Sequence, residues 1–187
     1  MTVAAVLLAA GRSHRFGGAD KLAAPLGDLP LGLHAARALM TLSLTGRFVV
    51  TGASSLEWPG FDAVPNDLGE AGMSHSIALG VAAARRSGAG AVLIALADMP
   101  LVTAEHFQAL LAHYRGPDSL VTSSNGADRM PPALFGGDWF DSLEALSGDR
   151  GARVILKRAV PVIADREQLL DIDTAEDLAT ARARLAG

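Results

Sequence analysis

The sequence predicts an α/β fold, a Rossmann-like and mostly parallel sheet with helices on both of its faces. Short apolar runs rich in Val, Leu and Ile alternate along the chain with segments whose apolar residues recur at helical spacing, which is the pattern of parallel strands joined by helices. The apolar runs are continuous, as expected of strands covered on both faces. A chain of 187 residues has the size of one domain, so we expect a single domain over residues 1–187.

The apolar runs predict strands at residues 3–8, 48–51, 91–96, 120–123 and 160–163. Helical spacing predicts helices at residues 31–44, 73–86, 103–114 and 174–185. Thr103 and Thr174 mark two of the helix starts, because a Thr side chain accepts a hydrogen bond from a backbone N–H of the first turn. Residues 125–139, with two adjacent prolines and two adjacent glycines, interrupt the alternation and predict an irregular insertion or a hairpin.

Composition excludes several classes of function. The chain has 16 basic and 20 acidic residues and a net charge of −4, which argues against a broad nucleic-acid or anionic-membrane surface because both need a cationic field. It contains no cysteine, which excludes disulfides, thiolate nucleophiles and Cys-liganded zinc. Its longest apolar runs fall far short of the ~20 residues that a spanning helix needs. We therefore expect no membrane segment and a cytoplasmic protein.

The first strand is followed by a glycine-rich turn that can bind an anion. Such a turn, at the carboxyl end of a parallel strand, exposes backbone N–H groups, and Arg12, Arg15 and Lys21 add positive charge that suits a triphosphate. The alternative is a solvated glycine loop that carries basic residues by chance. The spacing is neither that of a Walker loop, since no Ser or Thr follows Lys21, nor that of a dinucleotide turn, since Ser13 replaces its second glycine.

Two aspartates are candidates for holding a metal ion. Asp98 directly follows the apolar run at residues 91–97, at the carboxyl end of a predicted strand, where a carboxylate can bind Mg²⁺; the alternative is a turn residue before Pro100. Asp173 precedes the last predicted helix, where an aspartate commonly caps backbone N–H groups. The residues alone leave both alternatives open.

Six motifs follow one another along almost the whole chain: Leu8-Ala9-Ala10-Gly11-x-Ser13-x-Arg15-Phe16-Gly17 with Lys21 after it, Asn66 with Gly72-Met73-x-x-Ser76, Ala97-Asp98-Met99-Pro100, Gly126-x-x-Arg129-x-Pro131-Pro132-Ala133-Leu134-Phe135, Leu146-x-Gly148-Asp149-x-Gly151-Ala152-Arg153, and Asp171-Ile172-Asp173-Thr174-x-Glu176-Asp177-Leu178. In this order they resemble the motifs of the MobA-like nucleotidyltransferases, and among these the molybdenum cofactor cytidylyltransferases. One departure is Ala175, which stands where proline is usual.

The resemblance implies a nucleotidyltransferase that moves CMP from CTP to the terminal phosphate of the molybdopterin cofactor and releases pyrophosphate. It implies a Mg²⁺ ion held by Asp98 and Asp173, and acceptor binding by Arg129 and Pro132. The catalytic residues it implies are Lys21, Arg15 and Arg12. The nucleotide-binding residues it implies are Leu8, Ala9, Ala10, Gly11, Ser13, Asn66, Gly72, Met73 and Ser76.

Several alternatives stay open. GTP is the main competitor of CTP; Ala10 and Pro131-Pro132 fit the cytidylyl branch, whereas the guanylyl branch usually has a second glycine at the position of Ala10. The same residues would also serve a nucleotidyltransferase with another phosphate acceptor. A non-catalytic maturation factor would instead bind the cofactor or nucleotide and deliver it to a client molybdoenzyme without turnover.

Other polar and aromatic residues carry weaker expectations. The five histidines lack a metal-binding spacing and are expected mostly at the surface; they are His14, His34, His75, His106 and His113. Trp139 and Phe140 are expected in the core, with stacking against a flat ring as the alternative. Arg150 and Arg153 are either solvated or contacts for the acceptor phosphate.

Overall fold

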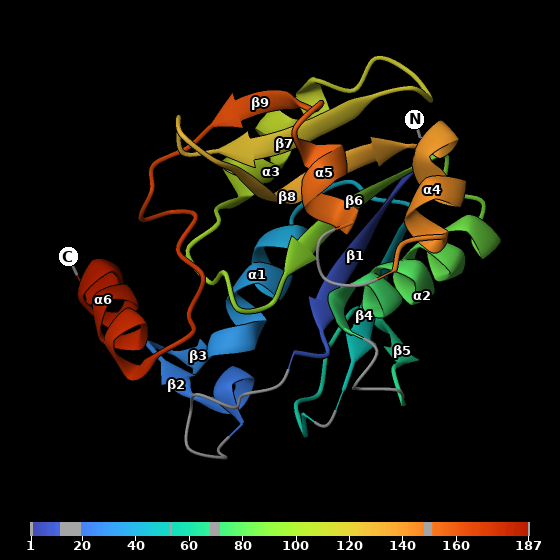
Figure 1. Cartoon of the computed structure of the whole chain (residues 1–187). Coiled ribbons are helices and arrows are strands. Elements are labelled where there is room, and N and C mark those ends of the chain that lie inside the picture. The colour runs from blue at the N-terminus through green and yellow to red at the C-terminus, as the bar shows by residue number, and fades with distance from the viewer. Residues whose placement is uncertain (1, 12–19, 53, 68–71, 148–150, 187) are drawn as a thin grey trace.

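The computed structural model describes residues 2–11, 20–52, 54–67, 72–147 and 151–186 (Figure 1). The strands are β1 (Val3–Ala9), β2 (Pro25–Leu26), β3 (Leu29–Pro30), β4 (Gly46–Thr51), β5 (Asp62–Pro65), β6 (Ala91–Leu96), β7 (Leu120–Ser124), β8 (Arg129–Gly136) and β9 (Val160–Ile163). The helices are α1 (Leu31–Met40), α2 (Gly72–Arg86), α3 (Ala104–Ala112), α4 (Phe140–Glu144), α5 (Gly151–Leu156) and α6 (Ala175–Ala186), with 3₁₀ turns η2 (Lys21–Ala23) and η3 (Gly137–Trp139).

Within the described residues, seven strands form one sheet in the order β5-β4-β1-β6-β8-β7-β9. β1 pairs in parallel with β4 and β6, β4 pairs in parallel with β5, and β7 pairs in parallel with β9. β8 runs antiparallel to both of its neighbours, β6 and β7. Helices α2, α4 and α5 lie on the near face of the sheet in Figure 1, and α1 and α3 lie on the far face. The predicted α/β fold with a mostly parallel sheet is therefore confirmed.

The two central strands are buried along their whole length, which explains their continuous apolar sequences. Every residue of β1 and every residue of β6 is buried. On one face, α2 packs close to β1 because Gly80 has no side chain: a Cβ atom there would lie 2.2 Å from the Cγ1 atom of Val6 and 3.1 Å from the Cγ2 atom of Val50. Gly80 thus sets the spacing between α2 and the sheet.

The segment 125–139 contains a central strand that its prolines concealed. A turn at residues 125–128 joins β7 to β8, so the hairpin alternative is correct, but β8 also runs through the middle of the sheet. The β7–β8 register passes from Thr122 opposite Ala133 to Ser123 opposite Met130. Pro131 and Pro132 fall between these pairs, where the ladder needs no N–H donor, which is how a central strand tolerates them.

Two histidines are buried, so the expectation of surface histidines is wrong for them. His34 places its Nε2 atom 2.7 Å from the carbonyl oxygen of Leu26. His106 places its Nε2 atom 2.7 Å from the Oγ atom of Ser123, whose hydroxyl donates to the carbonyl oxygen of Pro132 at 2.8 Å. Hydrogen-bonding partners inside the protein let both rings leave the solvent.

The burial of His106 predicts a pH-dependent stability. Burial lowers the pKa of this imidazole from its ordinary 6.5. Between the two pKa values the histidine is therefore mostly neutral in the folded state and mostly protonated in the unfolded chain. The free energy of unfolding should therefore fall as the pH drops below about 6.5 and level off below the folded-state pKa. Denaturant titrations at several pH values between about 5 and 8 should show that the free energy of unfolding depends less steeply on pH in His106→Gln than in the wild type. His113→Gln, which removes an exposed histidine at the end of α3, should keep the wild-type pH dependence. The same pH dependence in all three proteins would contradict the prediction.

No helix in the part of the chain that the structure describes is both long and apolar enough to cross a membrane.

Candidate functional site

Asp98 lies beside the start of the glycine-rich turn. β1 and β6 are parallel neighbours, with Leu8 opposite Leu96, and the backbone N–H of Ala97 donates to the carbonyl oxygen of Leu8 at 3.0 Å. Asp98 therefore follows β6 at the same edge of the sheet where Ala10 and Gly11 follow β1. This edge, at the carboxyl ends of parallel strands, is where open α/β sheets bind their ligands.

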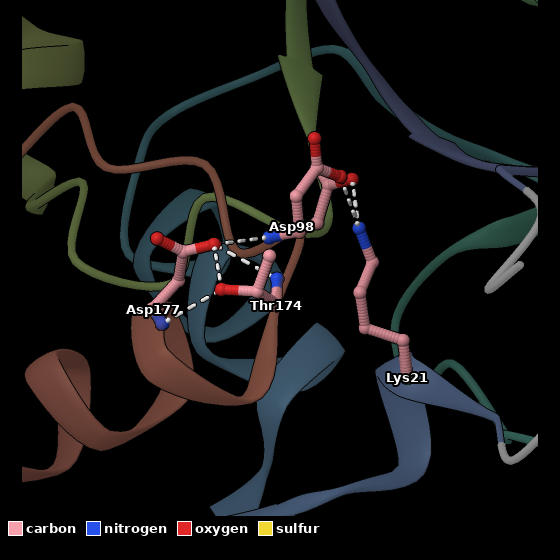
Figure 2. A network of polar contacts seen from close by, with 5 residues as sticks. Lys21, Asp98, Thr174 and Asp177 are labelled. Atoms are coloured by element: carbon pink, nitrogen blue, oxygen red, sulfur yellow. Dashed lines mark hydrogen bonds and ion pairs between the residues drawn. The ribbon is translucent and has the colours of Figure 1, made fainter. Parts of the chain in front are cut away.

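Lys21 reaches this edge from a short 3₁₀ turn. Asp20 caps the turn by accepting a hydrogen bond from the N–H of Leu22 at 3.0 Å, and Ser54 holds the same carboxylate with a 2.6 Å hydrogen bond. The Lys21 side chain is buried, and its Nζ atom lies 2.9 Å from Oδ2 of Asp98 and 3.4 Å from Oδ1 of Asp173. Figure 2 shows the ammonium pointing at Asp98. The structure thus brings together the predicted catalytic lysine and both predicted metal ligands.

A capping box follows Asp173 at the start of α6. Asp177 accepts hydrogen bonds from the N–H and the hydroxyl of Thr174, both at 2.8 Å, and from the N–H of Asp173 at 3.1 Å. The hydroxyl of Thr174 accepts from the N–H of Asp177 at 3.1 Å (Figure 2). Thr174 and Asp177 therefore start α6, and these hydrogen bonds lower the pKa of Asp177. The alternative of Asp173 as the helix cap is not what the structure shows.

The charges in this cluster are strongly coupled. Burial alone would lower the pKa of Lys21, but the attraction of Asp98, with smaller contributions from Asp171 and Asp173, outweighs it and raises that pKa. Asp98 uses Oδ2 for Lys21, while its Oδ1 atom is buried without a hydrogen-bond donor among the described residues. Burying a carboxylate oxygen in this way costs folding free energy unless a cation or a proton approaches it.

Asp171 belongs to the same cluster, although the sequence alone did not predict a role for it. Loss of hydration, followed by the negative charge of Asp98, raises the pKa of Asp171 to about 7, although part of the residue stays exposed. The chain also ties this segment to the sheet edge, because the N–H of Ile172 donates to the carbonyl oxygen of Asp98 at 2.9 Å. The available signal was the spacing of Asp171 and Asp173, since residues two apart in an extended segment share a face.

The acids suit a divalent cation that keeps other ligands. Among the described residues, no group of three or more His, Cys, Asp or Glu side chains could hold a metal ion. Asp98 and Asp173 already share one cation, the ammonium of Lys21. Mg²⁺ is commonly bound by one or two carboxylates together with water and substrate phosphates. The donor set therefore fits Mg²⁺ held jointly with a substrate.

The predicted nucleotide-binding residues lie along the same edge. Leu8 and Ala9 are buried in β1, and Ala10 and Gly11 continue from it toward the solvent. Arg12, Ser13 and Arg15 lie outside the described residues.

Two of the remaining nucleotide-binding candidates contact each other directly. The buried side-chain amide of Asn66 donates to the Oγ atom of Ser76 at 2.9 Å. Gly72 begins α2 with a positive φ of 75°, a conformation that favours glycine. Met73 follows it with a largely exposed side chain. This buried hydrogen bond ties Asn66, which follows β5, to the second turn of α2.

A cavity of about 1020 Å³ adjoins the carboxylate cluster. Asp171 and Met73 lie on its wall, together with Met99 and Met130, and Arg129, Arg153 and Lys157 add positive charge. The guanidinium of Arg129 also donates to the carbonyl oxygen of Lys157. The cavity thus has an apolar, methionine-lined wall and a basic part, and Asp171 connects it to Lys21 and Asp98.

The acceptor candidates are distributed unevenly around this cavity. Arg129 and Pro131 line it. The carbonyl oxygen of Pro132 instead accepts a hydrogen bond from the hydroxyl of Ser123. Trp139 packs against the core and donates to the carbonyl oxygen of Asp118 at 3.0 Å, and Phe140 is buried. Both aromatic residues therefore have the predicted core role. Arg150 lies outside the described residues.

Known proteins resemble this chain in sequence. The purine catabolism protein PucB of Bacillus subtilis is 36% identical over 92% of this chain and 92% of its own length. A phosphoenolpyruvate guanylyltransferase of Conexibacter woesei is 32% identical over 68% of this chain and 60% of its own length.

Solved structures share the fold. A nucleotidyl transferase from Methanothermobacter thermautotroptrophicus superposes with a TM-score of 0.85 at 22% identity, covering 99% of this chain and 98% of that one. Rv0371c of Mycobacterium tuberculosis in complex with manganese superposes with a TM-score of 0.78 at 18% identity, covering 98% of this chain and 99% of that one. The model of the MobA-like NTP transferase domain matches residues 5–163. The chain therefore belongs to the family of MobA-like NTP transferases.

Proposed function

We propose that the protein is a cytidylyltransferase that joins CMP from CTP to the terminal phosphate of molybdopterin. A phosphate oxygen of the acceptor attacks the α-phosphorus of CTP, the new P–O bond forms, and the bond to the β-phosphate oxygen breaks so that pyrophosphate leaves. The observation that carries the proposal is the cluster of Lys21, Asp98 and Asp173 at the carboxyl ends of β1 and β6, beside a cavity of acceptor size.

The residues of the chain divide the work between the two substrates. Arg12, Arg15 and Lys21 stabilise the negative charge that develops on the leaving pyrophosphate. The turn after β1 and the Asn66–Ser76 pair hold the nucleotide. Asp98 and Asp173 would hold Mg²⁺, which would supply positive charge to the phosphates. A structure of the same fold contains manganese, which supports a divalent cation in this role.

The acceptor cavity favours a large acceptor. Pockets for drug-sized ligands span about 300 to 1,000 Å³, and this cavity of about 1020 Å³ is at the upper end of that range. Phosphoenolpyruvate, the acceptor named for one relative, has three carbon atoms and would leave most of it empty. A flat, polarisable body against Met73, Met99 and Met130 and a phosphate near Arg129 would fill it better. We propose that the product then passes to a client molybdoenzyme.

The base is tested by the stability that each nucleotide adds. A ligand at 100 times its dissociation constant raises the free energy of unfolding by about 2.7 kcal/mol. With Mg²⁺ present, CTP should therefore raise the unfolding temperature more than GTP at the same concentration, measured by differential scanning fluorimetry with ATP and UTP as controls. A larger shift with GTP would replace the cytidylyl proposal by a guanylyl one.

The acceptor is tested by pyrophosphate release. Each of the four nucleotides is incubated with molybdopterin or with phosphoenolpyruvate, and pyrophosphate is measured. We expect release with CTP and molybdopterin together. Release with phosphoenolpyruvate alone among the acceptors would assign another acceptor, and tight binding without release in any combination would favour a non-catalytic maturation factor.

A further inference from the structure

The ammonium of Lys21 contacts two acidic side chains. Its Nζ atom lies 2.9 Å from Asp98 and 3.4 Å from Asp173, and both oxygens belong to the residues that fit a metal ion. Asp171 adds a third acidic group that interacts with the same lysine. In the protein without ligands, the cation between these acids is therefore one that the chain itself provides.

We propose that Lys21 is a built-in competitor of the divalent cation, which keeps a metal from binding tightly until the phosphates of the nucleotide draw the ammonium away. The proposal deepens the proposed function, because it sets the order in which its ligands bind: metal and nucleotide enter together. It extends the role of Lys21 from stabilising pyrophosphate to controlling the cation site before the nucleotide arrives.

Geometry and electrostatics both support this competition. A metal ion that uses Oδ2 of Asp98 and Oδ1 of Asp173 must replace the two contacts of Lys21, because the same oxygens are occupied. The Lys21–Asp98 pair is shielded, with side chains 9% and 22% exposed, so its attraction is stronger than in water. The side chain of Asp173 is 48% exposed, so its contact with Lys21 contributes less. The long stem of a lysine lets its ammonium move to a new anion without displacing the backbone.

The proposal is tested with Mn²⁺ alone, without nucleotide. Lys21→Met keeps most of the length of the side chain and removes its charge. Free Mn²⁺ is measured by electron paramagnetic resonance while the folded protein is titrated at mildly alkaline pH. Lys21→Met should bind Mn²⁺ about tenfold or more tightly than the wild type, because Asp98 and Asp173 then lack the ammonium that contacts both of them. Adding Asp98→Asn to Lys21→Met should abolish the gain.

Arg37→Met is the matched control. It also removes one positive charge from an ion pair, since Arg37 lies 2.9 Å from Asp28, but both partners are exposed and lie outside the cluster. Its Mn²⁺ affinity should equal that of the wild type. A folded Lys21→Met that binds Mn²⁺ no more tightly than the wild type would overturn the proposal, whatever nucleotide the enzyme uses. Because no nucleotide is present, this outcome is separate from a failure of the proposed transferase activity.

A second measurement uses the unaltered protein, in case Lys21→Met does not fold. Lys21 and Lys157 are the only lysines in the sequence, so ¹⁵N-lysine labelling gives two side-chain signals to assign. The Lys21 signal should stay in place with Mg²⁺ alone and move when Mg²⁺ and a non-hydrolysable CTP analogue are added together. A shift with Mg²⁺ alone would overturn the proposal, as would an unchanged signal while the backbone amides report bound nucleotide.

Discussion

Replacing Asp98 with asparagine is expected to lower the turnover of nucleotidyl transfer by about 10² or more, as removal of other preorganised electrostatic groups does. Asparagine has nearly the same shape, so the main loss is the negative charge. Asp98 binds Lys21 through Oδ2, and its Oδ1 atom is buried with no donor in the described part of the chain. Both oxygens are therefore placed for a cation, whereas a neutral amide offers only one oxygen and no negative charge. Steady-state pyrophosphate release measures the effect.

Asp141→Asn is the matched control for this change. Asp141 pairs with Arg85 at 2.6 Å, its side chain is 90% exposed, and it lies on α4, away from the cluster. The same chemical substitution should there leave turnover close to that of the wild type. If Asp98→Asn keeps its far-UV circular dichroism and remains within about threefold of wild-type turnover, far less than preorganised groups contribute, Asp98 has no part in the mechanism.

Gly80→Ala is expected to lower the free energy of unfolding by about 2 kcal/mol. The new Cβ would lie 2.2 Å from a methyl group of the fully buried Val6, so α2 and β1 must move apart, and overpacking of this kind costs up to about 3 kcal/mol. Alanine's better helix propensity returns about 1 kcal/mol, so the clash outweighs it. Urea denaturation monitored by circular dichroism gives the value.

The control adds the same methyl group where there is room for it. Among the described residues, a Cβ on Gly11 meets no atom within 4 Å, so Gly11→Ala should unfold with nearly the wild-type free energy. Because α2 also carries Ser76 and Met73, Gly80→Ala should raise the KM for the nucleotide as well. A Gly80→Ala protein as stable as the wild type would contradict this prediction and show that α2 and the sheet can accommodate the added methyl group.

The buried parallel strands could be predicted from sequence because burial on both faces leaves a direct mark, an uninterrupted apolar run such as that of β1 or β6. β8 left no such mark. Its two prolines argue against a central strand, and only the pairing with β7 shows that they fall in a gap of the ladder. β5 was missed for a related reason: as an edge strand with exposed Asp62 and Pro65, it lacks the apolar continuity of the centre.

Site residues were predictable where a position in the fold determines their role. Asp98 follows a buried strand, and Lys21 follows the glycine-rich turn; the structure places both at one edge of the sheet. The buried state of His106 was not predictable, because it depends on Ser123 from another element as a partner. The role of Asp173 could not be separated from capping until Thr174 and Asp177 were seen to form the cap.

The contact between Lys21 and Asp173 joins residues 152 positions apart. During translation, the sheet strands up to β9 leave the ribosome before the segment with Asp171 and Asp173 does. A nascent chain can therefore bury most of its apolar residues while the cluster of Lys21, Asp98, Asp171 and Asp173 is still incomplete. The contact between Lys21 and Asp173 can form only after this late segment has emerged and folded back beside β1 and β6.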